Sequence, residues 1–169
     1  VSPGTWYGSR VRIGMFDEQN GVFFEYDGQT LYAVRRSSTE ELSGNIAVNN
    51  GSASIAGTGT KFASELKPFD YVVIRGMAYL VLNIASDTVM TISPEYRGTN
   101  ISSANITKRI QQRIPQSQWN IDKCDGTGLS GYNMDLAKMQ MFYIDYSWYG
   151  AGAVRYGFKN QRGEVVYAH

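Results

Sequence analysis

Short β-type segments dominate the pattern of hydrophobic and polar positions along the chain. The clearest lies between Gly21 and Arg36, where two apolar and aromatic runs flank Asp27-Gly28. Asp-Gly readily adopts the positive φ angles of a tight hairpin turn, so we predict two antiparallel strands here. Apolar residues spaced three and four apart are nearly absent, and this favours an all-β fold.

The middle of the chain repeats the pattern at closer spacing. Three short strands are expected over residues 71–74, 78–84 and 89–92, with turn residues between them. This spacing is typical of a small barrel or sandwich. A further hairpin is expected across Asn49-Asn50-Gly51, with Ile46 and Val48 facing Ala53 and Ile55. The best helix is a single turn over residues 62–66.

An aromatic run near the C-terminus alternates strictly. On a strand, alternate side chains point to opposite faces. One face would carry Met139, Met141, Tyr143 and Asp145, and the other Gln140, Phe142, Ile144, Tyr146 and Trp148. Both faces are apolar enough to be covered. Strands over 153–158 and 164–167 would complete a meander.

Aromatic content divides the chain into a scaffold and an insertion. Residues 1–42 and 107–169 are predicted to form an aromatic-rich antiparallel β-sandwich or meander, and residues 43–106 a small inserted β-barrel-like module. The fold class is therefore all-β, with an antiparallel scaffold that carries the module. The chain opens on Val1, and we expect it to be processed or part of a longer chain.

Composition excludes several classes of function. Sixteen basic residues balance fifteen acidic ones without a basic stripe, so nucleic acid is not an expected partner. No apolar run approaches the roughly 20 residues of a membrane helix, so no membrane partner is expected. Cys124 is the only cysteine and His169 the only histidine. These counts argue against Ser-His-Asp and Cys-His catalysis and Cys-based zinc sites, and we expect no enzyme, no cofactor and an inert Cys124 thiol.

One polar loop offers oxygen ligands for a cation. Asn120, Asp122 and Asp125 lie close together between residues 116 and 133, and a calcium ion could use them. Asp and Asn side chains also shape loops by hydrogen-bonding backbone N–H groups. We prefer this second interpretation and predict no metal site.

Charged residues elsewhere are predicted to have structural roles. Asp145 lies inside the aromatic run, where an unpaired carboxylate would be costly to bury. Arg155 on the following strand is its expected partner, in a structural ion pair. Adjacent acids such as Asp17 and Glu18 are expected to be solvated loop charges.

The aromatic residues are also candidates for contacts with other molecules. Tyrosine and tryptophan rings bury much area at low entropic cost, so a sheet rich in them suits a large contact surface. The residues expected at such an interface are Tyr143, Tyr146, Trp148, Tyr149 and Trp119.

Several stretches resemble segments of virion structural proteins of large tailed phages, of the marine and cyanobacterial type. The scaffold stretches that carry this resemblance are residues 16–38, 113–120 and 141–152. The middle module resembles small β-modules of phage tail and fibre proteins, in Gly57-Thr58-Gly59-Thr60, Phe69-Asp70-Tyr71 and the segment Ile92-Ser93-Pro94-Glu95-Tyr96-Arg97-Gly98.

The resemblance implies a non-enzymatic component of the virion. The expected partners are other virion proteins and copies of the same chain, in a tail, baseplate or fibre rather than a capsid. A carbohydrate-binding adhesin module that recognises a host-surface glycan is the alternative. An enzyme relying on carboxylates is the third hypothesis.

Overall fold

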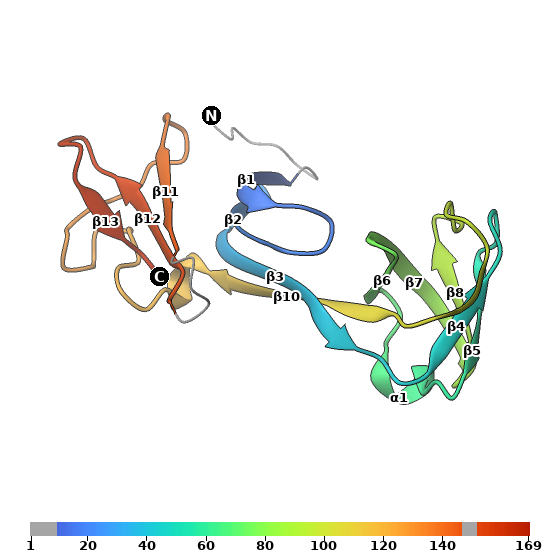
Figure 1. Cartoon of the computed structure of the whole chain (residues 1–169). Helices are drawn as coiled ribbons and strands as arrows, with labels where there is room; N and C mark the ends of the chain where they lie inside the picture. Colours follow the sequence, from blue (N-terminus) through green and yellow to red (C-terminus); the bar gives the residue numbers. More distant parts are fainter. Residues whose placement is uncertain (1–9, 147–151) are drawn as a thin grey trace. The chain divides into compact units, whose positions relative to one another are not determined.

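The regular secondary structure of the chain is almost entirely β (Figure 1). The computed structural model describes residues 10–146 and 152–169. Within these ranges the helical elements are two short turns, α1 (Phe62–Glu65) and η1 (Gln116–Gln118). The predicted all-β class is confirmed. No helix in the described ranges is long and apolar enough to cross a membrane.

The strands form two sheets. The larger has ten strands in the order β1-β2-β3-β10-β6-β7-β8-β5-β4-β9, and the smaller has the order β11-β12-β13. The ten strands are β1 (Val11–Phe16), β2 (Gly21–Tyr26), β3 (Leu31–Glu41), β4 (Asn45–Val48), β5 (Ser54–Thr58), β6 (Tyr71–Ile74), β7 (Met77–Ser86), β8 (Val89–Ser93), β9 (Ile101–Ala104) and β10 (Thr107–Pro115). The three others are β11 (Met141–Asp145), β12 (Arg155–Lys159) and β13 (Val165–Tyr167).

The chain divides into two compact units whose bounds differ from the predicted ones. Unit 1 comprises residues 1–16, 21–35 and 112–169, and unit 2 comprises residues 17–20 and 36–111. The boundaries fall inside β3 and β10 because these long strands contribute residues to both units. The sequence predicted an insertion of residues 43–106. The change in aromatic content along the sequence indicated that there are two cores. It did not show that β3 and β10 contribute residues to both units.

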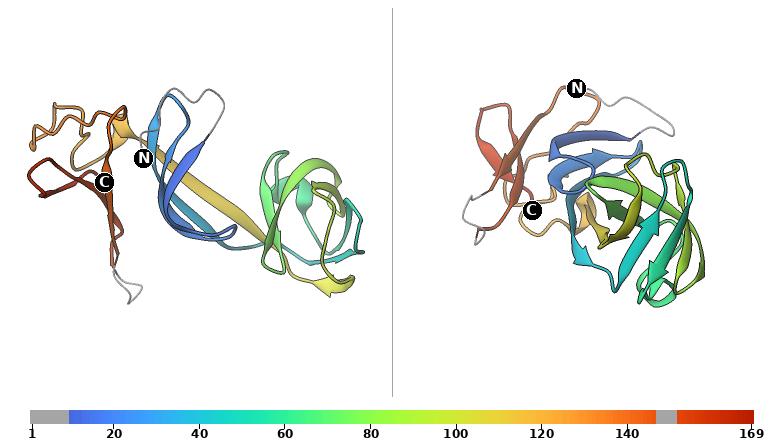
Figure 2. Two further views of the ribbon diagram at one scale, coloured as in Figure 1. Left: turned by 90° about the horizontal axis from the view of Figure 1, so that it is seen from above. Right: turned by 45° about the vertical axis from the view of Figure 1, so that its right-hand side comes forward.

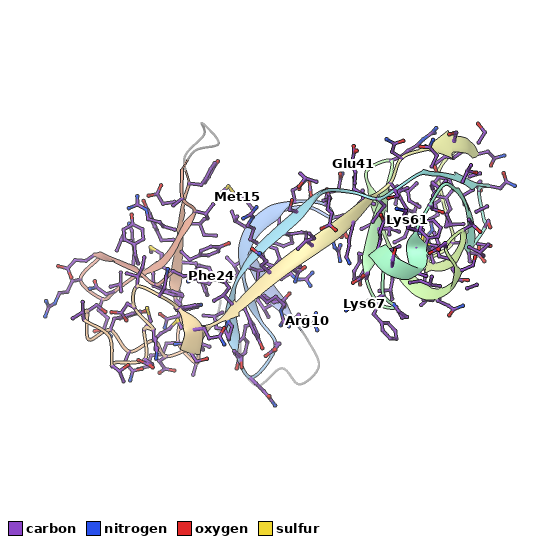
Figure 3. The ribbon with its side chains drawn as sticks, turned by 90° about the horizontal axis from the view of Figure 1, so that it is seen from below. Arg10, Met15, Phe24, Glu41, Lys61 and Lys67 are labelled. Carbon is purple, nitrogen blue, oxygen red and sulfur yellow. The ribbon has the colours of Figure 1, made fainter. Side chains whose placement is uncertain are left out.

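Unit 1 has two layers, as the predicted sandwich or meander requires. Phe24 on β2 contacts rings of the smaller sheet, with centroid distances of 5.0 Å to Phe142 and 4.9 Å to Phe158. The Tyr156 hydroxyl donates a 2.6 Å hydrogen bond to the carbonyl oxygen of Val34 on β3. Figure 3 draws the side chains, with Phe24 labelled. The fully buried members of this core include Phe24, Leu31, Ala33, Cys124, Phe158 and Ala168.

The hairpin of β2 and β3 follows the sequence prediction closely. Gly28 has a φ of 95°, as the predicted turn demands. Asp27 Oδ1 accepts hydrogen bonds from the backbone N–H groups of Gln29 (3.1 Å) and Thr30 (2.9 Å). The turn residues therefore supply both the positive φ angle and the side-chain acceptor that close the loop.

Unit 2 is a strongly curled sheet around its own apolar core (Figure 2). Its strand order begins with β10 and ends with β9, which are neighbours in sequence, so the sheet nearly encircles the core. The described strands leave it open, since no ladder joins β9 to β10. The largest fully buried members of this core are Tyr79, Tyr96, Phe62, Ile46, Ile55, Ile74, Met90 and Ile92.

Two predictions within unit 2 need correction or addition. The hairpin of β4 and β5 forms, but Ile46 lies opposite Gly57 rather than Ile55, so the loop is longer than expected. The hairpin of β6 and β7 turns at Arg75 and Gly76, with φ values of 45° and 87°. The sequence analysis identified neither β1 nor β10.

Because the two units have separate cores, we expect a substitution in one core to destabilise mainly its own unit. Phe24→Ala should remove about 3–5 kcal/mol from unit 1, and Ile55→Ala about 2–5 kcal/mol from unit 2. Amide hydrogen exchange of each variant should show faster exchange in its own unit, read at β12 for unit 1 and at β8 for unit 2. Equal loss of protection in both units from either variant would contradict two independent cores.

Candidate interaction surface

The smaller sheet separates its side chains into an inner and an outer face, as the alternating sequence predicts. Phe142 pairs across the strands with Phe158, and Ile144 with Tyr156. These four side chains pack into the core of unit 1. The opposite face of β11 therefore carries Met141, Tyr143 and Asp145.

The outer face combines two tyrosines with an ion pair. Arg155 on β12 lies opposite Asp145 and donates a hydrogen bond from Nη2 to Asp145 Oδ2. Its guanidinium also lies over the Tyr167 ring, 4.5 Å from the centroid. The Tyr167 hydroxyl donates to the same Asp145 oxygen at 3.4 Å. The hydrogen bond that Arg155 donates to Asp145 raises the pKa of Arg155.

The rings of Tyr143 and Tyr167 meet across the middle strand. Their centroids are 6.0 Å apart, with the planes at 71°. Gly157 lies between them in the register of the three strands. A Cβ atom at this position would come within 2.6 Å of the Val166 carbonyl oxygen, so the sheet requires glycine here. We call the set Met141, Tyr143, Asp145, Arg155 and Tyr167 the outer aromatic face.

Three of the five predicted interface aromatics lie within the described residues. Tyr143 belongs to the outer aromatic face and is half-buried, and Tyr146 is exposed at the end of β11. Trp148 and Tyr149 lie outside the described residues. Met139 and Met141 are much more exposed than these tyrosines, at 84% and 60%.

Trp119 is not an interface residue. Its side chain is 4% exposed and stacks on Phe158 at 5.8 Å in the core of unit 1. The indole Nε1 donates a 3.1 Å hydrogen bond to the Ile114 carbonyl oxygen. The ring covers the core of unit 1 at the end of β10. A large aromatic side chain at this position removes much apolar surface from contact with water. The polar residues around it in sequence gave no sign of this.

The candidate calcium loop is organised by its own hydrogen bonds. Asp122 Oδ1 accepts from the Cys124 N–H at 2.8 Å, and Oδ2 from the Ser130 N–H at 3.0 Å. Burial alone would raise the pKa of Asp122, but these hydrogen bonds lower it below the ordinary value. A Cβ at Gly128 would lie 2.2 Å from Asp122 Oδ1, so glycine allows the loop to close over the carboxylate.

The other two oxygen donors do not join Asp122. Asp125 Oδ1 accepts from the Thr127 N–H and hydroxyl at 3.0 and 2.6 Å, and Asn120 is exposed. Within the described residues no group of three His, Cys, Asp or Glu side chains could hold a metal ion. Cys124 is buried beneath this loop, and burial raises the pKa of its thiol to about 12. A protonated, enclosed thiol is a poor nucleophile.

A groove lies at one end of the smaller sheet. It encloses about 530 Å³, and its lining includes Tyr132, Lys138, Met139, Met141, Lys159 and Gln161. Methionine side chains adapt to different partner shapes because they are unbranched and polarizable. The groove therefore extends the contact area beyond the outer aromatic face.

The sequence analysis missed a buried carboxylate in unit 1. Glu25 on β2 is 0% exposed, and its two oxygens lie 2.6 Å from Arg12 Nε and 2.8 Å from Arg113 Nε. Arg113 also stacks over the Tyr32 ring, 4.0 Å from the centroid. Arg12 comes from β1 and Arg113 from β10, two strands that the sequence analysis did not identify. The arrangement holds three strands together and offers no exposed reacting group.

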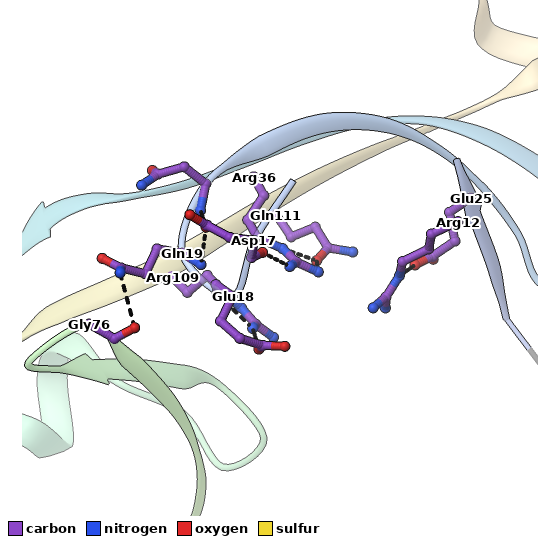
Figure 4. Close-up of polar contacts among 10 residues, drawn as sticks. Arg12, Asp17, Glu18, Gln19, Glu25, Arg36, Gly76, Arg109 and Gln111 are labelled. Carbon is purple, nitrogen blue, oxygen red and sulfur yellow. Dashed lines mark hydrogen bonds and ion pairs between the residues drawn. The ribbon is translucent and has the colours of Figure 1, made fainter. Parts of the chain in front are cut away.

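A second polar cluster belongs to unit 2 (Figure 4). Asp17 Oδ1 accepts hydrogen bonds from the Gln19 and Asn20 N–H groups at 2.8 and 2.7 Å. Both bonds lower the pKa of Asp17, and the bond from Asn20 has the larger effect. Arg36 donates to the Asp17 carbonyl oxygen. Glu18 pairs with Arg109 at 3.2 Å. Asp17 and Glu18 are therefore exposed loop charges, as expected from the sequence, and they also form hydrogen bonds and an ion pair within the loop region.

Removal of the buried carboxylate should destabilise the protein strongly. Glu25→Gln leaves two guanidinium groups without their counter-charge, and the free energy of unfolding should fall by about 3–5 kcal/mol. Denaturant titration followed by fluorescence measures this fall. Asp145→Asn is the matched control, because its pair is partly exposed and should contribute less than about 1 kcal/mol. Equal losses in the two variants would show that burial does not distinguish the pairs.

Comparison with known protein families, with curated proteins and with solved structures gave no match.

Proposed function

We propose that the protein is a non-enzymatic structural component of a tailed-phage particle, which acts by binding neighbouring particle proteins and copies of itself. A position in the tail, baseplate or fibre is favoured over the capsid by the tail- and fibre-like stretches of unit 2. The observation that carries the proposal is the outer aromatic face.

This face has the composition of a protein interface. Binding energy at interfaces is concentrated in tyrosine, tryptophan and arginine side chains near the centre of a contact. Tyr143, Tyr167 and Arg155 lie together on one face, and Met141 extends it. The Asp145 carboxylate already holds the arginine, so little side-chain entropy would be lost when a partner binds.

The support beneath the face is rigid. Phe142, Phe158 and Tyr156 fill the other side of the same three strands, and Tyr156 is hydrogen-bonded to β3. A contact surface on well-packed strands keeps its shape before it meets a partner, which favours binding.

The location of the protein in phage particles tests the proposal. Particles of the phage that encodes the chain would be purified, separated into tails and capsids, and analysed by mass spectrometry. We expect the protein in the tail fraction at a stoichiometric level. Its presence with capsids would move the role to the shell, and its absence from both fractions would overturn the proposal.

A carbohydrate-binding module is the second candidate, and the same face favours it. Aromatic rings beside a carboxylate and a guanidinium can stack on a sugar and hydrogen-bond its hydroxyl groups. If this candidate is right, a glycan array should give specific signals that Tyr143→Ala abolishes, while Tyr71→Ala in unit 2 leaves them intact. Signals no stronger than background would remove the candidate.

A further inference from the structure

Strand β11 has one side without a strand partner in the described structure. It is the terminal strand in the order β11-β12-β13, and within residues 10–146 and 152–169 it pairs with β12 alone. A terminal strand presents a row of N–H and C=O groups that can pair with another chain.

The register shows which groups face outward. The Tyr156 N–H donates to the His169 carbonyl oxygen at 2.7 Å, and its own carbonyl oxygen accepts from Ala168, so the backbone of Tyr156 faces β13. Alternate residues on a strand face opposite neighbours. The backbone N–H and C=O groups of Arg155, Gly157 and Lys159 therefore point towards β11. These residues lie opposite Asp145, Tyr143 and Met141. The backbone groups of Phe142 and Ile144 consequently point away from β12.

The opposite side of the same sheet is less available. The Ala168 carbonyl oxygen, just after β13, accepts hydrogen bonds from the Ile121 and Asp122 N–H groups at 3.1 and 3.2 Å. A chain segment of the protein itself therefore covers the C-terminal end of this edge. By contrast, β11 contains no proline or lysine, which commonly prevent edge pairing, and its one charged residue, Asp145, is paired with Arg155.

We propose that β11 of one chain pairs with β11 of a second copy, antiparallel and around a two-fold axis at Tyr143. In this register, Phe142 of each copy exchanges backbone hydrogen bonds with Ile144 of the other. The two smaller sheets then form one continuous sheet.

The sequence of β11 is complementary to itself in this register. On the inner face, Phe142 lies opposite the second copy's Ile144, an aromatic and β-branched pair that stabilises antiparallel sheets. On the outer face, the two Tyr143 rings meet at the axis, and Met141 lies opposite Asp145. No like charges face each other, and the residues Met141, Tyr143 and Asp145 of the outer aromatic face become continuous across the axis.

This pairing extends the proposed contact function, since it names a second copy as the partner at the edge of the outer aromatic face. The inferred pairing can be wrong while the proposed structural role remains right. A protein found in phage tails that does not form this dimer would keep its structural role and lose the inferred interface.

A single cysteine at the axis tests the register in the full chain. In Tyr143→Cys the new side chain lies directly opposite its own copy, in a non-hydrogen-bonded pair with Cα atoms about 4.5 Å apart. A disulfide can span this distance. Mild oxidation should therefore give a covalent dimer on a non-reducing gel. The native Cys124 is buried and should not contribute.

Met141→Cys is the matched control. It lies on the same face of the same strand, but its copy is four residues away along the paired strands, about 13 Å. We expect roughly tenfold more covalent dimer from Tyr143→Cys than from Met141→Cys. Equal yields from the two variants, or no dimer from either, would overturn the proposal.

Light scattering of charged variants gives a second readout that does not depend on disulfide chemistry. Tyr143→Lys brings two like charges together at the axis and should give a monomer. Met141→Lys faces Asp145 of the second copy and should remain a dimer. Both changes are on the outer face, so circular dichroism should show the β-sheet spectrum of the wild-type chain for both, which separates loss of pairing from loss of folding. A wild-type chain that is monomeric at all concentrations would also overturn the inferred pairing.

Discussion

The buried carboxylate of Glu25 constrains the arrangement of the strands in unit 1. A carboxylate removed from water costs several kcal/mol unless cations lie against it. Arg12 and Arg113 supply these cations from β1 and β10, on either side of β2 in the strand order. A shift of β1 by one residue would turn Arg12 to the other face and leave the charge poorly compensated. The ion pairs therefore select one register for three strands, and the inner face that carries Phe24 depends on that register.

The same constraint explains which parts of the fold could be predicted from the sequence. Segments whose pattern is local were predicted well, such as the hairpin around Asp27-Gly28 and the alternating faces of β11. β10 was missed because its middle, from Lys108 to Arg113, is strongly polar. Its arginines are stabilised by residues far away in sequence, Arg109 by the Tyr71 ring at 3.7 Å and Arg113 by Glu25. A pattern of hydrophobic positions cannot reveal a strand whose stabilising contacts are ionic and distant.

The candidate site shows a similar division. Asp145 and Arg155 could be matched because both lie on neighbouring strands of one meander. Trp119 could not be placed, since the choice between core and surface depends on which elements cover it. The sequence predicted that both faces of the aromatic run would be covered, but Met139 and Met141 are exposed, while Phe142 and Ile144 on the opposite face pack into the core. Alternation alone shows which residues share a face and not which face is covered.

The hydrogen bond between the Leu42 N–H and the Ile106 carbonyl oxygen, 3.0 Å long, has an evolutionary consequence. It makes neighbours of the two ends of the 65-residue segment from Leu42 to Ile106, which holds the second core. A segment whose ends already meet can be exchanged for another of different length or shape at little cost in loop-closure entropy. β3 and β10 can thus stay unchanged while the segment between them is replaced, so that related chains could differ in unit 2 and keep unit 1.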